Sequence, residues 1–452
     1  MSRMSLLSDL LSSLNRRPWF GRDQSDFRCS IDDVVSLCRK LLRSRGEATG
    51  ILTASEILMS LQNCSTEHLS RFFEVLALDF APDEAMLSAA AANYAEAPSA
   101  HNLAALQAAA EAPRQELFRR LNLAPGGTAA LVRLREKLLP LVKENRDIYG
   151  PVDKDFLHLF QSWFNRGFLV LKPIDWNTPA AILEKIIAYE AVHAIDSWDS
   201  LRNRLAPPDR RCFAFFHPAI PDDPLIFVEV ALTADIPASI AAVLSDERQA
   251  IELEEAQTAV FYSISNCHAG LAGVSFGSFL IKQVASDLKE TLPNLKSFVT
   301  LSPVPGFARW LKQLDGKPRD RLLPEEKRAL EIIEEIDWTN DPQKVENARE
   351  GLLALAARYF LIAKRDDGQP IDPVARFHLG NGAILNRVMH MADLSTTGLR
   401  QSHGVMVNYL YDLPRIEQRH EAYAASADIA ASRAVTALLP SRASQDDLRN
   451  VA

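Results

Sequence analysis

The stretch that decides the fold of the second half of the chain runs from Phe261 to Phe307: FYSISNCHAGLAGVSFGSFLIKQVASDLKETLPNLKSFVTLSPVPGF. It opens on the apolar run FYSIS, passes through a turn of small residues into the amphipathic run FLIKQVASDLKE, and closes on the apolar run SFVTL. This order predicts a strand, a glycine turn, a helix and a second strand parallel to the first. Such a turn can direct backbone N–H groups at a phosphate or a thioester oxygen. The unit therefore has the pattern of a binding site for a cofactor-like ligand.

Two features of this unit have a structural as well as a functional interpretation. Gly270, Gly273 and Gly277 would let a ligand approach the backbone closely, although tight packing of a helix on a strand explains small residues equally well. Ser302 lies where Pro303 ends the predicted strand, so its hydroxyl is expected to face an opening. The alternative is an ordinary Ser-Pro turn residue.

A histidine and two tyrosines further along the chain are also candidates for a site. His378 lies in ARFHLGNGAILNRV, just before a loop-like Gly-Asn-Gly sequence. The run VMVNYLYDL (Val405–Leu413) predicts a strand with Tyr409 and Tyr411 on one face. The alternatives are a structural histidine and aromatic packing against the sheet.

The composition of the chain is that of a soluble globular protein of about two domains. Its 452 residues are 47% apolar and 24% charged, and the formal net charge is -8. That charge argues against a nucleic-acid-binding protein, and no apolar window is long enough for a transmembrane helix. Basic residues cluster in RKLLRSR (Arg39–Arg45), which we interpret as a solvated helix face.

The five cysteines are scattered, with no CxxC pair and no histidine at ligand spacing. This predicts reduced thiols in a cytosol-like compartment and no structural zinc or other metal site. Residues 1–22 have a Ser- and Arg-rich texture like that of a transit peptide, but Asp9 interrupts it. We interpret the segment as an ordinary first helix and expect a cytoplasmic protein.

The hydrophobic pattern divides the chain near residue 176. Helical spacing dominates before it, as in IDDVVSLCRKLL and HLSRFFEVLAL, which predicts an all-α bundle over residues 1–176. Thr128 and Thr178 are expected to cap helices. Beyond Thr178 the runs RCFAFFH and LIFVEVAL flank the turn PAIPDDP. This hairpin and the unit described above predict a mixed α/β domain over residues 177–452, and hence an α+β protein.

Several blocks together resemble the malonyl-CoA decarboxylase family: FYSISNCHAGLAGVSFGSFLIKQV, SFVTLSPVPGFARWL, FHLGNGAILNRVMHMADLS and GVMVNYLYDL, in that order behind a helical half. The resemblance covers most of residues 115–415. It implies a helical oligomerisation domain followed by a catalytic domain of the GNAT acyltransferase type, which binds acyl-CoA. The acyl-CoA loop pattern of that superfamily would fall on residues 267–272, where Cys267 departs from the usual polar first residue.

The resemblance also implies the residues of the site. Ser302 and His378 would be catalytic, with Tyr411 as a supporting phenol. The segment that binds malonyl-CoA would comprise Ala272, Gly273, Val274, Ser275, Phe276, Gly277 and Ser278. Ser275 departs from the glutamate expected in the family, which leaves the role of that glutamate to another group.

The implied reaction converts malonyl-CoA to acetyl-CoA and CO2 without a cofactor, because the thioester can accept the electrons that CO2 leaves behind. His378 would protonate the resulting enolate, while Ser302 would either bind the carboxylate or relay a proton. The family suggests a homo-oligomer, specifically a tetramer, in fatty acid metabolism. Two other functions remain open: an acyl-CoA-dependent N-acyltransferase, and a non-catalytic acyl-CoA-sensing interaction protein.

Overall fold

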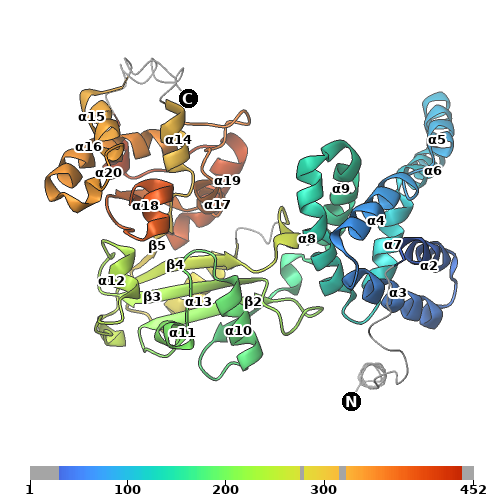
Figure 1. Cartoon of the computed structure of the whole chain (residues 1–452), viewed down its shortest axis with the longest axis horizontal. Helices are drawn as coiled ribbons and strands as arrows, with labels where there is room; N and C mark the ends of the chain where they lie inside the picture. Colours follow the sequence, from blue (N-terminus) through green and yellow to red (C-terminus); the bar gives the residue numbers. More distant parts are fainter. Residues whose placement is uncertain (1–29, 275–278, 315–321, 440–452) are drawn as a thin grey trace. The chain divides into compact units, whose positions relative to one another are not determined.

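The computed structural model describes residues 30–274, 279–314 and 322–439, and it divides them into two compact units (Figure 1). The first unit contains residues 30–169 together with the short segments 217–221 and 268–274. The second contains residues 170–216 and 222–267 and the described residues from 279 onward. The α+β class expected from the sequence is confirmed, since the first unit is helical and the second is built on a mixed sheet.

The first unit is a set of helices around an apolar core. They are α2 (Ile31–Arg43), α3 (Glu47–Gln62), α4 (Thr66–Leu78), α5 (Glu84–Glu96), α6 (Ala100–Ala110), α7 (Pro113–Asn122), α8 (Gly127–Glu144) and α9 (Arg146–Trp163). Ser30 and Ser65 cap α2 and α4 by accepting backbone N–H groups of the first turn. In the core, the rings of Phe118 and Phe156 stack with centroids 4.0 Å apart. The alanine-rich helices α5 and α6 bury no side chain.

The cap predicted at Thr128 is wrong. Helix α8 begins at Gly127, behind Gly126 in the left-handed conformation (φ 71°). The Thr128 hydroxyl instead donates to Asn122 Oδ1 at 2.8 Å. The hydroxyl that was expected to cap the helix therefore bonds to a nearby side-chain amide oxygen instead.

The second unit is organised around an eight-stranded sheet of order β1-β2-β3-β4-β5-β8-β6, with β7 paired to β8. The strands are β1 (Val170–Ile174), β2 (Arg210–Phe216), β3 (Ile226–Thr233), β4 (Thr258–Asn266), β5 (Ser297–Thr300), β6 (Ser302–Pro303), β7 (Ile384–Met389) and β8 (Met406–Leu410). The predicted hairpin is the antiparallel pair β2 and β3. The predicted parallel pair is β4 and β5, joined through helix α13 (Phe279–Thr291).

The remaining helices of this unit either pack against the sheet or lie on the far side of β5 (Figure 1). They are α10 (Ala180–Tyr189), α11 (Trp198–Leu205), α12 (Ile240–Leu244), α14 (Phe307–Leu314), α15 (Pro324–Ile333), α16 (Pro342–Leu361), α17 (Pro373–Gly380), α18 (Thr396–Ser402), α19 (Ile416–Ser426) and α20 (Arg433–Thr436). The cap predicted at Thr178 is also wrong, because Pro179 precedes α10 and Thr178 Oγ1 accepts from the Asp175 N–H at 3.0 Å.

Two expectations from composition have different outcomes. Within the described residues, no helix is both long and apolar enough to cross a membrane. Cys38, Cys212 and Cys267 are buried free thiols, whereas Cys64 is disulfide-bonded. The expectation of reduced thiols is therefore wrong for Cys64.

Candidate active site

Ser302 is placed by the junction of three strands in the second unit. Strand β5 ends at Thr300, and two residues later Ser302 begins β6, where it pairs with Val407 of β8. The Ser302 side chain is buried (5% exposed), because this pairing covers the end of the strand that was expected to face an opening. Its hydroxyl donates to Thr300 Oγ1 at 2.8 Å. Thr300 Oγ1 also accepts the Tyr409 N–H at 3.1 Å, so one threonine oxygen of β5 joins all three strands.

His378 lies near the end of α17 and bridges Ser302 to Tyr411. Its Nε2 is 3.2 Å from Ser302 Oγ, and its Nδ1 is 2.7 Å from Tyr411 Oη. Because the single Ser302 hydroxyl hydrogen goes to Thr300, Nε2 must carry the ring proton to hydrogen-bond Ser302. Nδ1 then accepts the Tyr411 O–H. The network thus selects the tautomer of His378 with its proton on Nε2, aimed at Ser302.

Two tyrosines surround the imidazole. The ring of Tyr409 stacks on His378 with centroids 4.5 Å apart and planes 25° from parallel. Tyr411 lies just beyond β8, held by a hydrogen bond from its N–H to the Phe298 carbonyl (2.8 Å). Strand β8 is shorter than the predicted strand. Tyr409 and Tyr411 nevertheless both contact His378, as the alternation of side chains along the strand predicted. The expectation missed the stacking of Tyr409 on His378.

Burial without a charged partner sets the ionisation of this cluster. It lowers the pKa of His378 to about 3 and raises the pKa of Tyr411 well above its usual value. Both effects have the same cause, since a dry site disfavours the charged form of either group. The imidazole and the phenol are therefore neutral at physiological pH.

The helix that carries His378 is anchored at its other end by a buried carboxylate. Asp372 caps α17 by accepting the Ala375 N–H at 2.8 Å, and it also accepts the Tyr359 O–H at 3.0 Å. Burial raises the pKa of Asp372 to about 6. A Cβ atom at Gly306, four residues after Ser302, would lie 2.3 Å from Tyr359 Oη. Tyr359 therefore contacts both chain segments that carry the Ser302 and His378 pair.

The turn expected to bind malonyl-CoA is described only in part. Ser275, Phe276, Gly277 and Ser278 lie outside the described residues. Ala272, Gly273 and Val274 belong to the helical unit. Arg135 of α8 donates to the carbonyls of Gly270 and Ala272, both at 2.8 Å. The structure therefore does not bring these residues together with Ser302 in one unit.

Gly270 has a packing role that the sequence left as an alternative. A Cβ atom there would lie 2.0 Å from the Val132 carbonyl oxygen of α8, so only glycine fits. Cys267, at the start of the proposed acyl-CoA pattern, is instead buried in the core of the sheet unit.

Residues 273–277 also read GVSFG, which matches the GxSxG sequence of hydrolase nucleophile elbows. An elbow places its serine on a sharp turn directly between a strand and a helix. Here β4 already ends at Asn266, and the short helix η3 (Ala269–Leu271) intervenes before Gly273. The context of an elbow is therefore absent from the described part of this turn.

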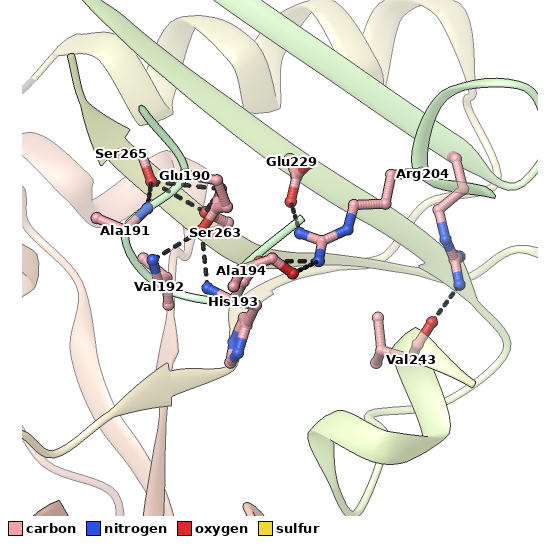
Figure 2. A network of polar contacts seen from close by, with 11 residues as sticks. Glu190, Ala191, Val192, His193, Ala194, Arg204, Glu229, Val243, Ser263 and Ser265 are labelled. Atoms are coloured by element: carbon pink, nitrogen blue, oxygen red, sulfur yellow. Dashed lines mark hydrogen bonds and ion pairs between the residues drawn. The ribbon is translucent and has the colours of Figure 1, made fainter. Parts of the chain in front are cut away.

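A second buried polar cluster in the sheet unit holds a loop rather than forming a site (Figure 2). The carboxylate of Glu190, just after α10, accepts the Ser263 hydroxyl at 2.7 Å. It also accepts the N–H groups of Val192 (2.7 Å) and His193 (2.8 Å). One carboxylate thus ties the loop between α10 and α11 to strand β4, which lies beside β5 in the sheet.

An ion pair completes this cluster (Figure 2). Arg204 of α11 donates to Glu229 Oε2 at 2.9 Å and to the carbonyls of His193 and Ala194. Burial raises the pKa of Glu229 to about 7, even though Arg204 opposes the shift. The attraction within a buried ion pair is largely offset by the hydration that both charges lose. We therefore assign Arg204 and Glu229 a role in positioning α11 on β3.

Comparisons with known proteins show the family of the chain. Two family descriptions match: the malonyl-CoA decarboxylase N-terminal domain over residues 80–164 and the C-terminal domain over residues 167–449. The chain is similar to "Malonyl-CoA decarboxylase, mitochondrial" from Anser anser anser (37% identical, covering 71% of this chain and 68% of the relative) and from Rattus norvegicus (34% identical, covering 72% and 70%).

Comparison with solved structures indicates the same family. The fold resembles crystal structures of malonyl-CoA decarboxylases from Rhodopseudomonas palustris (TM-score 0.87, 53% identity) and Agrobacterium vitis (TM-score 0.84, 54% identity). Each comparison covers 90% of this chain and 99% of the other. Both halves of the chain match the family in sequence, and almost all of it matches in structure. The chain therefore belongs to the malonyl-CoA decarboxylase family.

Proposed function

We propose that this protein is a carboxy-lyase that converts malonyl-CoA to acetyl-CoA and CO2, using Ser302, His378 and Tyr411. The observation that carries the proposal is the buried, neutral His378 held between a hydroxyl and a phenol at 3.2 Å and 2.7 Å. Family membership supports malonyl-CoA as the substrate.

The neutral imidazole suits the step that follows loss of CO2. When the carbon–carbon bond breaks, its electron pair passes into the thioester and forms an enolate. His378 donates its Nε2 proton to the enolate carbon, and Nδ1 takes the Tyr411 proton at the same time, so the imidazole stays neutral. A solvent proton then reaches Nε2 while Nδ1 returns its proton to Tyr411, which restores the starting tautomer. The net reaction consumes one proton and releases CO2 and acetyl-CoA.

Ser302 acts before the enolate is protonated. We propose that its oxygen holds the Nε2 proton until substrate enters, and that the malonyl carboxylate then occupies a position beside the hydroxyl. Surrounding aromatic groups leave that carboxylate poorly hydrated, and the uncharged product CO2 is favoured in such a setting. Thr300 keeps the serine hydroxyl directed away from Nε2 throughout.

Incubating the purified protein with malonyl-CoA alone tests the proposal against its alternatives. Acetyl-CoA and CO2 in equal amounts support the lyase. An absolute requirement for an amine acceptor would indicate an N-acyltransferase, and saturable binding without turnover would indicate an acyl-CoA sensor.

Two substitutions test the assigned residues. Ser302→Ala and His378→Ala are each expected to lower kcat by about two orders of magnitude or more, the usual scale for acid–base groups. His68→Ala is the matched control, because His68 is an exposed histidine of α4. Near-normal CO2 release by either site variant would remove that residue from the mechanism.

We further propose that the protein is a homo-oligomer, specifically a tetramer, and that it works in the cytoplasm. The family resemblance supports the first proposal, and the free thiols of Cys38, Cys212 and Cys267 support the second. Light scattering coupled to gel filtration measures the mass in solution, and a monomer would contradict the first. Fractionation of cells that make the protein tests the second.

A further inference from the structure

The helical unit includes a short piece of chain that interrupts the sequence of the sheet unit. Strand β4 ends at Asn266 and helix α13 begins at Phe279, and both elements belong to the sheet unit. Residues 268–274, which lie between them in sequence, belong to the helical unit instead. A turn between a strand and a helix can direct backbone N–H groups at a phosphate or a thioester oxygen. The helical unit therefore holds the described part of the turn expected to bind malonyl-CoA.

A buried arginine of α8 holds this turn. Arg135 Nη1 donates to the carbonyls of Gly270 and Ala272, both at 2.8 Å. Its Nε donates to Asp153 Oδ1 of α9 at 2.8 Å, and the Arg135 side chain is only 3% exposed. Hydrogen bonds from a charged donor are stronger than those between neutral groups. The two carbonyls of the turn are therefore held in one direction, toward α8.

The direction of a carbonyl also fixes the N–H group of the same peptide unit. None of the described peptide bonds is cis, so the C=O and N–H of each planar unit point in opposite directions. Because the Ala272 carbonyl points at Arg135, the Gly273 N–H points away from it. Gly273 has a φ of 80°, and its N–H forms no hydrogen bond with any described residue. Arg135 thus orients a backbone donor that the described residues leave available.

The turn contacts α8 at a second point. A Cβ atom at Gly270 would lie 2.0 Å from the Val132 carbonyl oxygen. Val132 and Arg135 are three residues apart in the helix, so they are neighbours on one face of it. The close approach sets the distance of the turn from α8. An apolar residue at position 135 could serve packing alone, but it could not hold two carbonyls in one direction.

We propose that Arg135 is a positioning residue for the binding of malonyl-CoA. It keeps the turn in the form in which the Gly273 N–H can donate to an oxygen of the acyl-CoA, so the substrate does not have to order the turn on binding. Such preorganisation raises affinity without accelerating the chemical step. Ser302, His378 and Tyr411 belong to the other unit. The substrate rests on the proposed function, whereas Arg135 has no part in breaking the carbon–carbon bond.

Calorimetric titration with acetyl-CoA, the proposed product, measures binding without turnover. Arg135→Gln should bind acetyl-CoA about tenfold more weakly, because the ligand must then order a turn that has lost two charge-assisted hydrogen bonds. In steady-state kinetics with malonyl-CoA, the same variant should raise KM about tenfold and leave kcat unchanged. Arg135→Lys keeps the charge and can reach one of the two carbonyls, so it should recover part of the lost affinity.

Arg114→Gln is the matched control, because Arg114 is a buried arginine of the same unit with contacts of the same kind. It pairs with Asp155 of α9 at 2.5 Å and donates to the carbonyls of Leu76 and Phe80, which lie outside the turn. Both glutamine variants should lower the thermal midpoint. Only Arg135→Gln should weaken the binding of acetyl-CoA, which separates positioning of the turn from general stability of the helices.

Asp153→Asn decides the question if Arg135→Gln does not fold. Asp153 is partly exposed, and its replacement leaves Arg135 in place but removes the charge that orients it. This variant should raise KM and the dissociation constant of acetyl-CoA in the same direction, by a smaller factor.

The proposal is overturned if the wild-type protein does not bind acetyl-CoA, if binding and KM are unchanged in folded Arg135→Gln, or if Arg114→Gln weakens binding equally. A fall in kcat at constant KM would also overturn it. Failure of the proposed function looks different: the wild-type protein would bind acetyl-CoA but release no CO2 from malonyl-CoA. The binding comparison between the two arginine variants would then still decide the role of Arg135.

Discussion

Thr300→Val separates the role of the Thr300 hydroxyl from its shape. Valine fills nearly the same volume but cannot hydrogen-bond, and Thr300 is fully buried. The substitution removes the acceptor of the Ser302 hydroxyl (2.8 Å) and of the Tyr409 N–H (3.1 Å). The Tyr409 N–H is then buried without a partner, which costs about 1–3 kcal/mol of folding free energy.

The effect on activity depends on the atom to which the Ser302 hydroxyl donates its hydrogen. Without Thr300 Oγ1, the Ser302 hydroxyl turns to donate to His378 Nε2, and the ring proton moves to Nδ1. That tautomer has no Nε2 proton to give to an enolate. Restoring the active tautomer costs about one neutral hydrogen bond, roughly 1–1.5 kcal/mol, which corresponds to a fall in kcat of about tenfold.

The assay is CO2 release from malonyl-CoA, with thermal unfolding measured on the same samples. Thr300→Ser keeps the hydroxyl and is the control; it should retain kcat close to that of the wild type. Nitrogen chemical shifts of His378 report which ring nitrogen carries the proton. Wild-type kcat in Thr300→Val, or an Nε2 proton that persists in it, would refute the reasoning.

Three further predictions follow from the structure. Because the pKa of His378 in the folded protein is about 3, kcat should show no fall centred near pH 6.5; such a fall would mean that the imidazole is charged in the resting site. The unfolded chain binds this proton first, so stability should decline as pH drops from about 6.5 toward 3, and His378→Gln should lessen the decline seen in denaturant titrations. Tyr411→Phe should lower kcat about tenfold or more with little change in KM, because Nδ1 loses its donor; an equal rise in KM would point to a binding role instead. Gly270→Ala should lower the thermal midpoint by an amount equivalent to about 1–3 kcal/mol, since its Cβ would meet the Val132 carbonyl at 2.0 Å, whereas Gly50→Ala, with 3.8 Å to its nearest neighbour, should be tolerated.

The sheet could be predicted where its strands have local signals. The hairpin of β2 and β3 has two apolar runs flanking a turn rich in Pro and Asp, and β4, α13 and β5 follow the order of their hydrophobic patterns. The two failed helix caps had equally good local signals. Thr128 and Thr178 each found a partner outside the helix end, Asn122 Oδ1 and the Asp175 N–H. Capping propensity shows that a residue is suited to cap a helix. It does not show which other hydrogen-bond partners compete for the same side chain.

The candidate site shows the same limit. Ser302, His378 and Tyr411 were named from family resemblance, and the structure brings them within hydrogen-bond distance of one another. Thr300 was missed because its role depends on β8 crossing the end of β5, a pairing that no local pattern reveals. Its one available signal was spacing, since side chains two apart on a strand share a face, as Thr300 and Ser302 do.

The contact between Tyr359 and Asp372 has a practical consequence for labelling the protein. This hydrogen bond closes the loop between α16 and α17 at its base, so the loop tip is not needed to hold the helix that carries His378. Residues 365–368 are exposed, and a side chain at Gly368 would meet only open space. A cysteine introduced at Asp366 therefore offers an attachment point for a fluorophore that reports on this region without disturbing the Ser302 and His378 pair.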